Sequence, residues 1–426
     1  MTPPKTHMAA WEQLNPLSRK LWDQSSRLIV GGGQAHKRHV RYLARGGPGF
    51  FTHAKGAYVY DADGREYIDY LLGYGPIVLG HCDYEFNAIV ARQMTQSGVQ
   101  GGEHPLEIEL AERLTKLIPG AEMLMYLIGG SASTSASLRV ARAHTGRERV
   151  IRCGYHGWHD WCVPASPGVP ADERGRILDF PYNDLAALER QLETHRAAVA
   201  AVIIESVQDD GPAPGFFAGV RELCDRHGCL FILDEVKTGF RFDLGGAQKL
   251  YGIQPDLSTF GKALGNGFPL SVLVGRRHIL EKRSDCYCSA TFHGDPIACA
   301  ASLACLDLLE LRDGIAHQHR LGRRLIDGLN RVFKDADFPL RMEGHPAMPN
   351  PREGYVGEPA RPLPSGWAGR CAREWFAAMQ RNGVFVNWHV WFLSTAHRAA
   401  DIEATIKIAR KAVKQTCAVM QRPSVD

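Results

Sequence analysis

Two short apolar runs with a helix-like segment between them constrain the fold of this 426-residue chain more than any other feature. Residues 201–204 read Ala-Val-Ile-Ile and residues 230–233 read Leu-Phe-Ile-Leu. The intervening residues 217–227 have helical character and stop before Gly228. Strands this apolar are typical of a parallel sheet that helices cover on both faces. The sequence therefore predicts an α/β domain with a mainly parallel central sheet and ligands at the carboxyl ends of its strands.

The chain is longer than a usual single domain, so we expect two domains. An N-terminal segment, 1–57, is assigned to a small domain, residues 58–310 to a large domain, and residues 311–426 to the rest of the small α+β domain. Alternating apolar and polar residues around Asp63-Gly64 predict a hairpin. The Pro- and Gly-rich residues 346–366 predict a surface excursion.

Composition favours small-molecule chemistry. The 50 basic and 46 acidic residues nearly cancel and are interspersed, which gives no support for a nucleic-acid partner or a polyanionic surface. No run approaches the roughly 18 apolar residues of a membrane helix, and we expect a soluble cytoplasmic protein without a membrane partner. The 11 cysteines lack a repeated spacing, and Cys286 and Cys288 lack a second ligand pair, so we expect reduced thiols and no metal.

A glycine turn between an apolar run and a helical segment forms a candidate phosphate site. Gly129, Gly130 and Ser131 follow the apolar residues 123–128. Backbone N–H groups and the helix dipole at such a turn can hold an anion, and Ser131 adds a hydroxyl donor. The alternative is a simple helix cap. The other glycine and lysine clusters lack the spacing of a Rossmann or Walker loop, which disfavours nucleotide binding.

Asp234 and Lys262 suggest the chemistry. Asp234 ends the second apolar run, and Lys262 follows in Phe-Gly-Lys-Ala-Leu-Gly. A carboxylate beside a pyridine nitrogen keeps the ring protonated, and a partly desolvated lysine amine condenses with an aldehyde. These are the needs of pyridoxal 5'-phosphate. Residues 155–160, Tyr-His-Gly-Trp-His-Asp, leave three interpretations open: Tyr155 stacking on the cofactor ring, an aromatic-rich turn, or a His/His/Asp metal site.

Four motifs occur in an order that resembles class III aminotransferases: residues 154–157, 234–241, 260–262 and 289–296. The likeness extends from about Tyr58 to Ile408 and is strongest to glutamate-1-semialdehyde aminomutase and its aminotransferase relatives. It implies a fold-type I PLP-dependent transferase.

The resemblance also implies roles at the cofactor ring. Lys262 would form the Schiff base and then shuttle the proton. Asp234 would pair with the pyridine nitrogen. Val236 and Tyr155 would pack against opposite faces of the ring.

The resemblance implies further contacts at the phosphate and phenolic oxygen. Gly130 and Ser131 would hold the phosphate, and Thr291 would reach the phosphate of a partner subunit. That role requires a homodimer with shared active sites. Gln208 or Asp210 would approach the phenolic oxygen of the cofactor.

The substrate side departs from the aminomutase pattern. The phosphate turn lacks one hydroxyl and one carboxylate, and Trp388-His389 replaces a Phe-Glu pair. Arg41 matches the arginine that meets a substrate carboxylate, although a surface arginine is the alternative. Trp388 and Trp391 either belong to a core or form the floor of a substrate pocket.

The sequence thus predicts an aminotransferase that moves an amino group from an amino acid donor to an aldehyde or ketone acceptor. An oxidised amino sugar or another specialised metabolite is compatible with the altered pocket motifs. The alternative is an aminomutase or epimerase, which returns the amine to the same carbon skeleton. A homologue without chemistry is disfavoured because Asp234 and Lys262 are both present.

Overall fold

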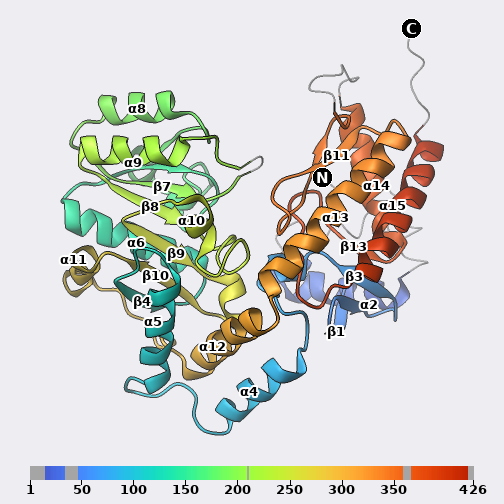
Figure 1. The fold of residues 1–426 in the computed structure, drawn as a ribbon, viewed down its shortest axis with the longest axis horizontal. Coiled ribbons are helices and arrows are strands. Elements are labelled where there is room, and N and C mark those ends of the chain that lie inside the picture. Colours follow the sequence, from blue (N-terminus) through green and yellow to red (C-terminus); the bar gives the residue numbers. More distant parts are fainter. Residues whose placement is uncertain (1–14, 34–46, 209–210, 358–365, 421–426) are drawn as a thin grey trace. The chain divides into compact units, whose positions relative to one another are not determined.

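The computed structural model describes residues 15–33, 47–208, 211–357 and 366–420 and divides the chain into two compact units (Figure 1). Unit 1 comprises Met1–Tyr74, Leu79–Asp83 and Ala316–Asp426. Unit 2 comprises Gly75–Val78 and Tyr84–Ile315.

Unit 2 is built around a seven-stranded sheet with the order β4-β10-β9-β8-β7-β5-β6. Strand β10 is antiparallel to β4 and β9, and the other neighbours are parallel. The mainly parallel sheet is therefore confirmed. The strands are β4 (Met123–Leu127), β5 (Arg149–Cys153), β6 (Ile177–Asp179), β7 (Val199–Glu205), β8 (Leu230–Asp234), β9 (Leu257–Phe260) and β10 (Ser271–Gly275).

Helices cover both faces of this sheet (Figure 1). Its helices are α4 (Tyr84–Met94), α5 (Pro105–Leu117), α6 (Gly130–Thr145), α7 (Ala171–Arg176), α8 (Leu185–Thr194), α9 (Phe216–His227), α10 (Gly246–Tyr251), α11 (Arg277–Leu280) and α12 (Pro296–Leu311). Its short 3-10 turns are η3 (Asp160–Cys162), η4 (Lys262–Gly265) and η5 (Glu281–Asp285).

Successive residues of the central strands enter different cores. Ala201 and Ile203 of β7 pack with α6 and α11, whereas Val202 and Ile204 pack with α8 and α9. All seven residues of β7 are buried. Because side chains alternate across a sheet, a strand covered on both faces must be apolar throughout, which explains the apolar runs of the sequence.

Unit 1 combines a four-stranded sheet with the order β1-β2-β3-β13, a β11-β12 pair and a helical layer. Helices α13, α14 and α15 share one apolar core that includes Leu325, Trp375 and Ile402. Strand β13 is parallel to β3, and the other pairs are antiparallel. The elements are α2 (Pro16–Leu28), η1 (Val30–Gly32), β1 (Phe51–Lys55), β2 (Tyr58–Asp61), β3 (Glu66–Asp69), η2 (Leu72–Tyr74), α13 (Gly314–Asp335), β11 (Leu340–Glu343), β12 (Asn350–Glu353), α14 (Trp367–Arg381), β13 (Val384–Phe385) and α15 (Ala399–Val419).

The division of the chain differs from the boundaries at 57/58 and 310/311 that the sequence suggested. Strands β2 and β3 form the expected hairpin, in which Tyr60 pairs with Glu66. They belong to unit 1 because they pair with β1 and β13.

The segment at residues 346–366 also differs in part from the expectation. It contains β12, and Ala347 and Met348 are buried, so its first half is an integral part of unit 1. Residues 358–365 lie outside the described residues.

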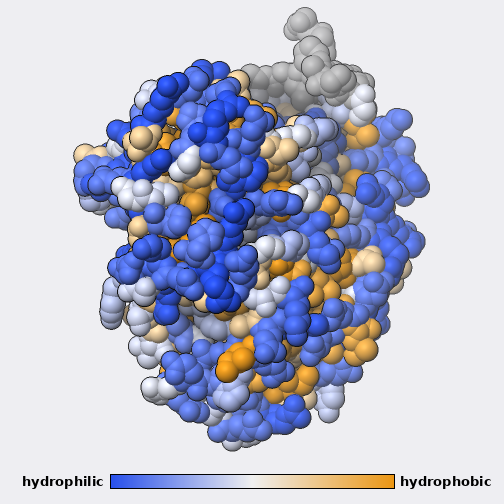
Figure 2. Space-filling model, turned by 60° about the vertical axis from the view of Figure 1, so that its left-hand side comes forward, coloured by the Kyte–Doolittle hydropathy of each residue, from blue (hydrophilic) through white to orange (hydrophobic). Residues whose placement is uncertain are grey.

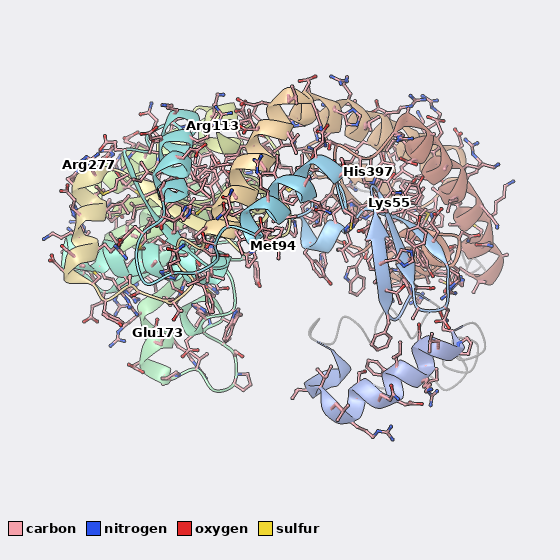
Figure 3. All side chains as sticks on the ribbon, turned by 90° about the horizontal axis from the view of Figure 1, so that it is seen from below. Lys55, Met94, Arg113, Glu173, Arg277 and His397 are labelled. Atoms are coloured by element: carbon pink, nitrogen blue, oxygen red, sulfur yellow. The ribbon has the colours of Figure 1, made fainter. Side chains whose placement is uncertain are left out.

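Polar residues dominate the visible face in Figure 2, with smaller apolar areas between them. In Figure 3, Arg113 extends from α5, and its ion pair with Glu310 links that helix to α12. Over the described ranges, no helix combines the length and apolar character needed to cross a membrane.

Candidate active site

The polar side chains of unit 2 gather where its central parallel strands end. Glu205 is the last residue of β7 and pairs in register with Asp234, the last residue of β8. Asp234 in turn pairs with Thr259 of β9. Cys153 ends β5, and the segment that carries Tyr155 follows it. The sheet therefore brings together side chains that lie about a hundred residues apart in sequence, at the edge where α/β proteins bind ligands.

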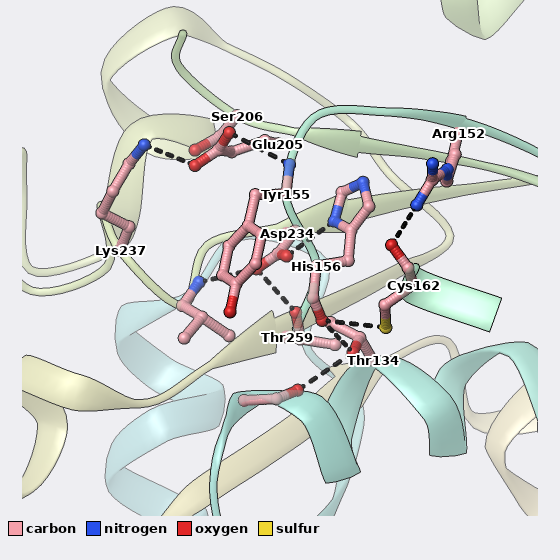
Figure 4. Close-up of polar contacts among 12 residues, drawn as sticks. Thr134, Arg152, Tyr155, His156, Cys162, Glu205, Ser206, Asp234, Lys237 and Thr259 are labelled. Carbon is pink, nitrogen blue, oxygen red and sulfur yellow. Dashed lines mark hydrogen bonds and ion pairs between the residues drawn. The ribbon is translucent and has the colours of Figure 1, made fainter. Parts of the chain in front are cut away.

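Three donors converge on the Asp234 carboxylate (Figure 4). The Val236 amide donates to Oδ1 at 3.0 Å, and the Thr259 hydroxyl donates to Oδ1 at 3.3 Å. The His156 Nδ1 lies 2.8 Å from Oδ2. The residue is only 5% exposed, so these contacts fix its orientation. An oriented carboxylate of this kind can hold the protonated nitrogen of a pyridine ring.

His156 contacts Asp234, and sequence reasoning considered it only as part of a possible metal site and gave it no role toward the cofactor. Its two ring nitrogens both face acceptors, Asp234 Oδ2 and the Cys153 carbonyl, the latter at 3.1 Å from Nε2. These two contacts fix the orientation of the His156 ring beside the carboxylate. The position of His156 next to Tyr155, inside the motif at residues 154–157, was the sequence feature that could have indicated a role at the cofactor site.

Lys262 begins η4, directly after β9, in a left-handed conformation with φ 43°. Few non-glycine residues adopt this region, and it recurs at functional sites. Desolvation lowers the pKa of Lys262 from 10.5 to about 8, and the nearby cation of Lys237 contributes in the same direction. The carboxylates of Glu205 and Asp234 oppose the shift. A larger share of neutral amine, which is the nucleophilic form, is therefore present near neutral pH.

Glu205 joins two segments of the site (Figure 4). Its Oε1 forms an ion pair with Lys237, and its Oε2 accepts a long hydrogen bond of 3.5 Å from the Tyr155 amide. Gly154 adopts φ 107°, and a Cβ there would stand 2.7 Å from the Glu205 Cβ and 2.5 Å from the Gln208 Nε2. Only glycine therefore lets these two side chains approach the turn.

The glycine turn before α6 has the geometry of an anion cup. Gly129, at φ 81°, precedes the helix, and Gly130 is its first residue. A Cβ on Gly130 would stand 2.7 Å from Val236 Cγ1, so a larger residue would displace Val236. The Ser131 Oγ accepts a hydrogen bond of 3.3 Å from the Trp158 amide. Glycine, a hydroxyl and a helix N-terminus thus occur together on the side of Val236.

The aromatic segment after Gly154 does not gather its histidines around one point. His156 contacts Asp234, whereas the His159 Nδ1 lies 2.7 Å from the Ser135 hydroxyl. Within the described ranges, no group of three or more His, Cys, Asp or Glu side chains is arranged to hold a metal. The Tyr155 ring is 67% exposed, which leaves its face free to stack on a bound ring.

Glu235, the residue after Asp234, stabilises the local structure. Glu235 is fully buried and accepts from the amides of Ala247 at 3.0 Å and Gln248 at 2.6 Å and from the Thr238 hydroxyl. Desolvation raises the pKa of Glu235 to about 7. This side chain ties the turn after Asp234 to the start of α10.

The other residues expected at the site come from both units. Thr291 is exposed in the loop before α12. Gln208 is partly buried after β7, and its Nε2 lies 3.6 Å from the Cys153 Sγ beside the Gly154 turn. Trp388 is 41% exposed in unit 1, next to His389 with ring centroids 5.9 Å apart. Trp391 is fully buried, which settles it as core. Arg41 and Asp210 lie outside the described residues.

The site residues of unit 2 fit pyridoxal phosphate. They include a fixed carboxylate, a partly buried amine, a glycine cup with a hydroxyl, and an exposed aromatic ring. The comparisons with known proteins point to the same cofactor. A model of the family "Aminotransferase class-III" matches residues 42–349.

Relatives and solved structures cover nearly the whole chain. A 3-aminobutyryl-CoA aminotransferase of Cloacimonas acidaminovorans is 33% identical over 93% of this chain and 97% of its own length. A glutamate-1-semialdehyde 2,1-aminomutase of Anaeromyxobacter dehalogenans is 35% identical over 95% and 99%. The FumI protein of Sphingopyxis sp. MTA144, solved in its PLP internal aldimine form, superposes with a TM-score of 0.87 at 29% identity, covering 94% of this chain and 96% of its own. The chain therefore belongs to the class-III aminotransferase family and is a fold-type I enzyme that uses pyridoxal phosphate.

Proposed function

We propose that this enzyme transfers an amino group from an amino acid donor to an aldehyde or ketone acceptor, with Lys262 as the proton-transferring base. The observation that supports this most directly is the environment of Lys262, whose pKa is lowered to about 8 beside the fixed carboxylate of Asp234. A base that works near neutral pH needs a pKa close to that pH. The bound cofactor supplies an electron sink for the bonds at the amine-bearing carbon.

We assign the remaining roles to residues of the chain itself. In this proposal Asp234 holds the ring nitrogen, and His156 keeps that carboxylate oriented. Gly130 and Ser131 hold the phosphate, and Val236 and Tyr155 cover the two faces of the ring. With the cofactor bound, Lys262 would hold its aldehyde group. The Lys262 Nζ would also serve as the base that accepts a proton from the substrate carbon and gives it back during the transfer.

Substrate selection is assigned to a separate set of residues. We assign the donor carboxylate to Arg41 and the acceptor pocket to Trp388 and His389, with Gln208 or Asp210 near the phenolic oxygen. Trp388 is exposed enough to meet a ligand, which supports this role. An oxidised amino sugar is one acceptor that an indole surface and a histidine would suit.

A homodimer with shared sites is part of the proposal. Thr291 is exposed, and its neighbours Tyr287 and Phe292 expose 85% and 58% of their surfaces. Large aromatic side chains in one short exposed segment are typical of an interface. In the proposed dimer, Thr291 binds the phosphate of the partner subunit.

The test is a half-reaction. The enzyme loaded with pyridoxal phosphate is mixed with single amino acids, and the loss of visible cofactor absorbance and the release of the oxo acid are followed together. The wild type and Lys249→Ala, a surface control in α10, should turn over, whereas Lys262→Ala should bind cofactor but release no oxo acid at a measurable rate. Normal turnover by Lys262→Ala would refute the assignment.

An aminomutase or epimerase is the second candidate, since several relatives carry an aminomutase name. Substrate supplied to the enzyme without a separate donor distinguishes the two. Isomerised product with no oxo acid released favours the second candidate, whereas a strict requirement for both donor and acceptor supports transamination.

A further inference from the structure

A groove in unit 1 collects a high density of positive charge. Side chains of α13 and α15 line it and enclose about 680 Å³. We call it the basic groove, and its cationic side chains are Arg320, Arg323, Arg324, Arg331, Lys407 and Arg410. The groove contains only two carboxylates, Asp327 and Glu403.

The groove carries a local excess of positive charge, because its six cationic side chains face only two carboxylates. Such a concentration of positive charge attracts anions.

Four of these six cations have no carboxylate partner among the described residues. Arg324 pairs with Glu403 at 2.8 Å. Over the part of the chain that the structure describes, Arg323, Arg331, Lys407 and Arg410 form no ion pair with a carboxylate. Unpaired cations that share one groove repel one another, and an anion bound between them would relieve that repulsion.

Helix geometry brings the cations together. Arg320, Arg324 and Arg331 recur at helical spacing along α13, as Lys407 and Arg410 do along α15. The two helices approach closely at Gly328, where a Cβ would stand 2.8 Å from the Ile406 Cγ1. A glycine at this crossing lets two basic faces line one groove.

We propose that the basic groove is a binding site for a small anion that carries two or more phosphate groups. Guanidinium groups bind phosphate through paired N–H donors, and five arginines lie along the groove. Its volume falls in the range of about 300–1,000 Å³ that is common for small-molecule sites. It shares no residue with the cofactor site, which lies in unit 2. A lining from two helices around a volume of small-molecule size favours a small anion over a nucleic acid or a membrane surface.

The test is isothermal titration of the holoenzyme, at low and at physiological salt, with three probes: tripolyphosphate, ATP and coenzyme A. Arg331→Gln/Arg410→Gln removes two unpaired groove cations. Arg190→Gln/Arg226→Gln, on α8 and α9 of unit 2, is the matched control because it removes the same charge from exposed positions. We expect binding to weaken about tenfold for each groove cation removed, the scale of one charge-assisted hydrogen bond, and to change less than about twofold in the control.

The arms of the experiment also identify the source of the phosphates. Comparable binding of all three probes assigns recognition to the phosphate chain, and binding of ATP or coenzyme A alone assigns it to a nucleotide. Protection of the groove arginines from phenylglyoxal by the bound probe, read by mass spectrometry on the wild type, checks the site without any substitution. Three results would overturn the proposal. They are the absence of saturable binding at low salt, an equal loss of affinity in the control variant, and binding of RNA or anionic vesicles but of none of the three probes.

Discussion

Replacement of Lys237 by Met should raise the pKa of Lys262. Lys237 is the leading charged contributor to the lowered pKa of Lys262, after desolvation. The substitution removes this repulsion and also leaves Glu205 without its ion-pair partner, so Glu205 attracts the Lys262 ammonium more strongly. Both changes stabilise the charged amine. The loss of repulsion by Lys237 and the stronger attraction by Glu205 both raise the pKa of Lys262.

The magnitude follows from the size of one charge interaction. A repulsion of about 1 kcal/mol or more between two like charges, at an effective dielectric constant near 20, corresponds to ~0.7 pKa unit or more, so a rise of ~1 pKa unit is expected. With the pKa at about 8, roughly one Lys262 amine in ten is neutral at pH 7. After a rise of ~1 unit, roughly one in a hundred is neutral, a tenfold loss of reactive amine.

The assay measures the amine without cofactor. Cofactor-free enzyme is labelled briefly with acetic anhydride across a pH series, and the extent of acetylation at Lys262 is read by mass spectrometry. The midpoint should move upward in Lys237→Met. Lys249→Met is the matched control, because Lys249 also pairs with a carboxylate, Asp243 at 3.0 Å, but does not contribute to the Lys262 shift. An unchanged or lower midpoint in Lys237→Met, or an equal rise in the control, would refute the reasoning.

Three further substitutions test other parts of the site. In cofactor-free enzyme, Lys262→Met should increase the free energy of unfolding at pH 7 by up to ~3 kcal/mol, because the folded pKa of about 8 lies below the ordinary 10.5. The stability of the wild type should rise between pH 8 and pH 10.5, which urea titrations at both pH values measure. A stability difference between the two proteins that stays constant over this range would contradict the reasoning. His156→Phe removes the donor to Asp234 Oδ2 and should weaken cofactor binding by ~1–3 kcal/mol in an absorbance titration, whereas His159→Phe in the same segment should not. Gly130→Ala should weaken cofactor binding because its Cβ meets Val236 at 2.7 Å, and adding Val236→Ala should recover part of the loss; no recovery would assign the effect elsewhere.

Local sequence patterns were sufficient to predict the central sheet. The apolar runs that became β7 and β8 must be buried on both faces, and an acid at the end of such a run lies at the ligand edge. The glycine turn before α6 was visible for the same reason, because strand, glycine and helix follow one another in the chain.

Contacts between distant segments were beyond local reasoning. His156 lies 78 residues from Asp234, and the spacing between them gives no hint that both ring nitrogens meet acceptors. Strands β2 and β3 fell into the other unit because their partners, β1 and β13, come from both ends of the chain. The charges of the basic groove are interspersed in the sequence and become adjacent only through helix periodicity and the crossing at Gly328.

The turn from Asp234 to Val236 has a consequence for how this enzyme can diversify. One hydrogen bond of 3.0 Å joins the Val236 amide to the Asp234 carboxylate, and a Cβ on Gly130 would stand 2.7 Å from that same valine. A substitution at Gly130 or Val236 therefore changes the packing of the other residue. We expect tolerated changes at this turn to occur as compensating pairs, and single changes in substrate range to arise at residues that do not touch the turn.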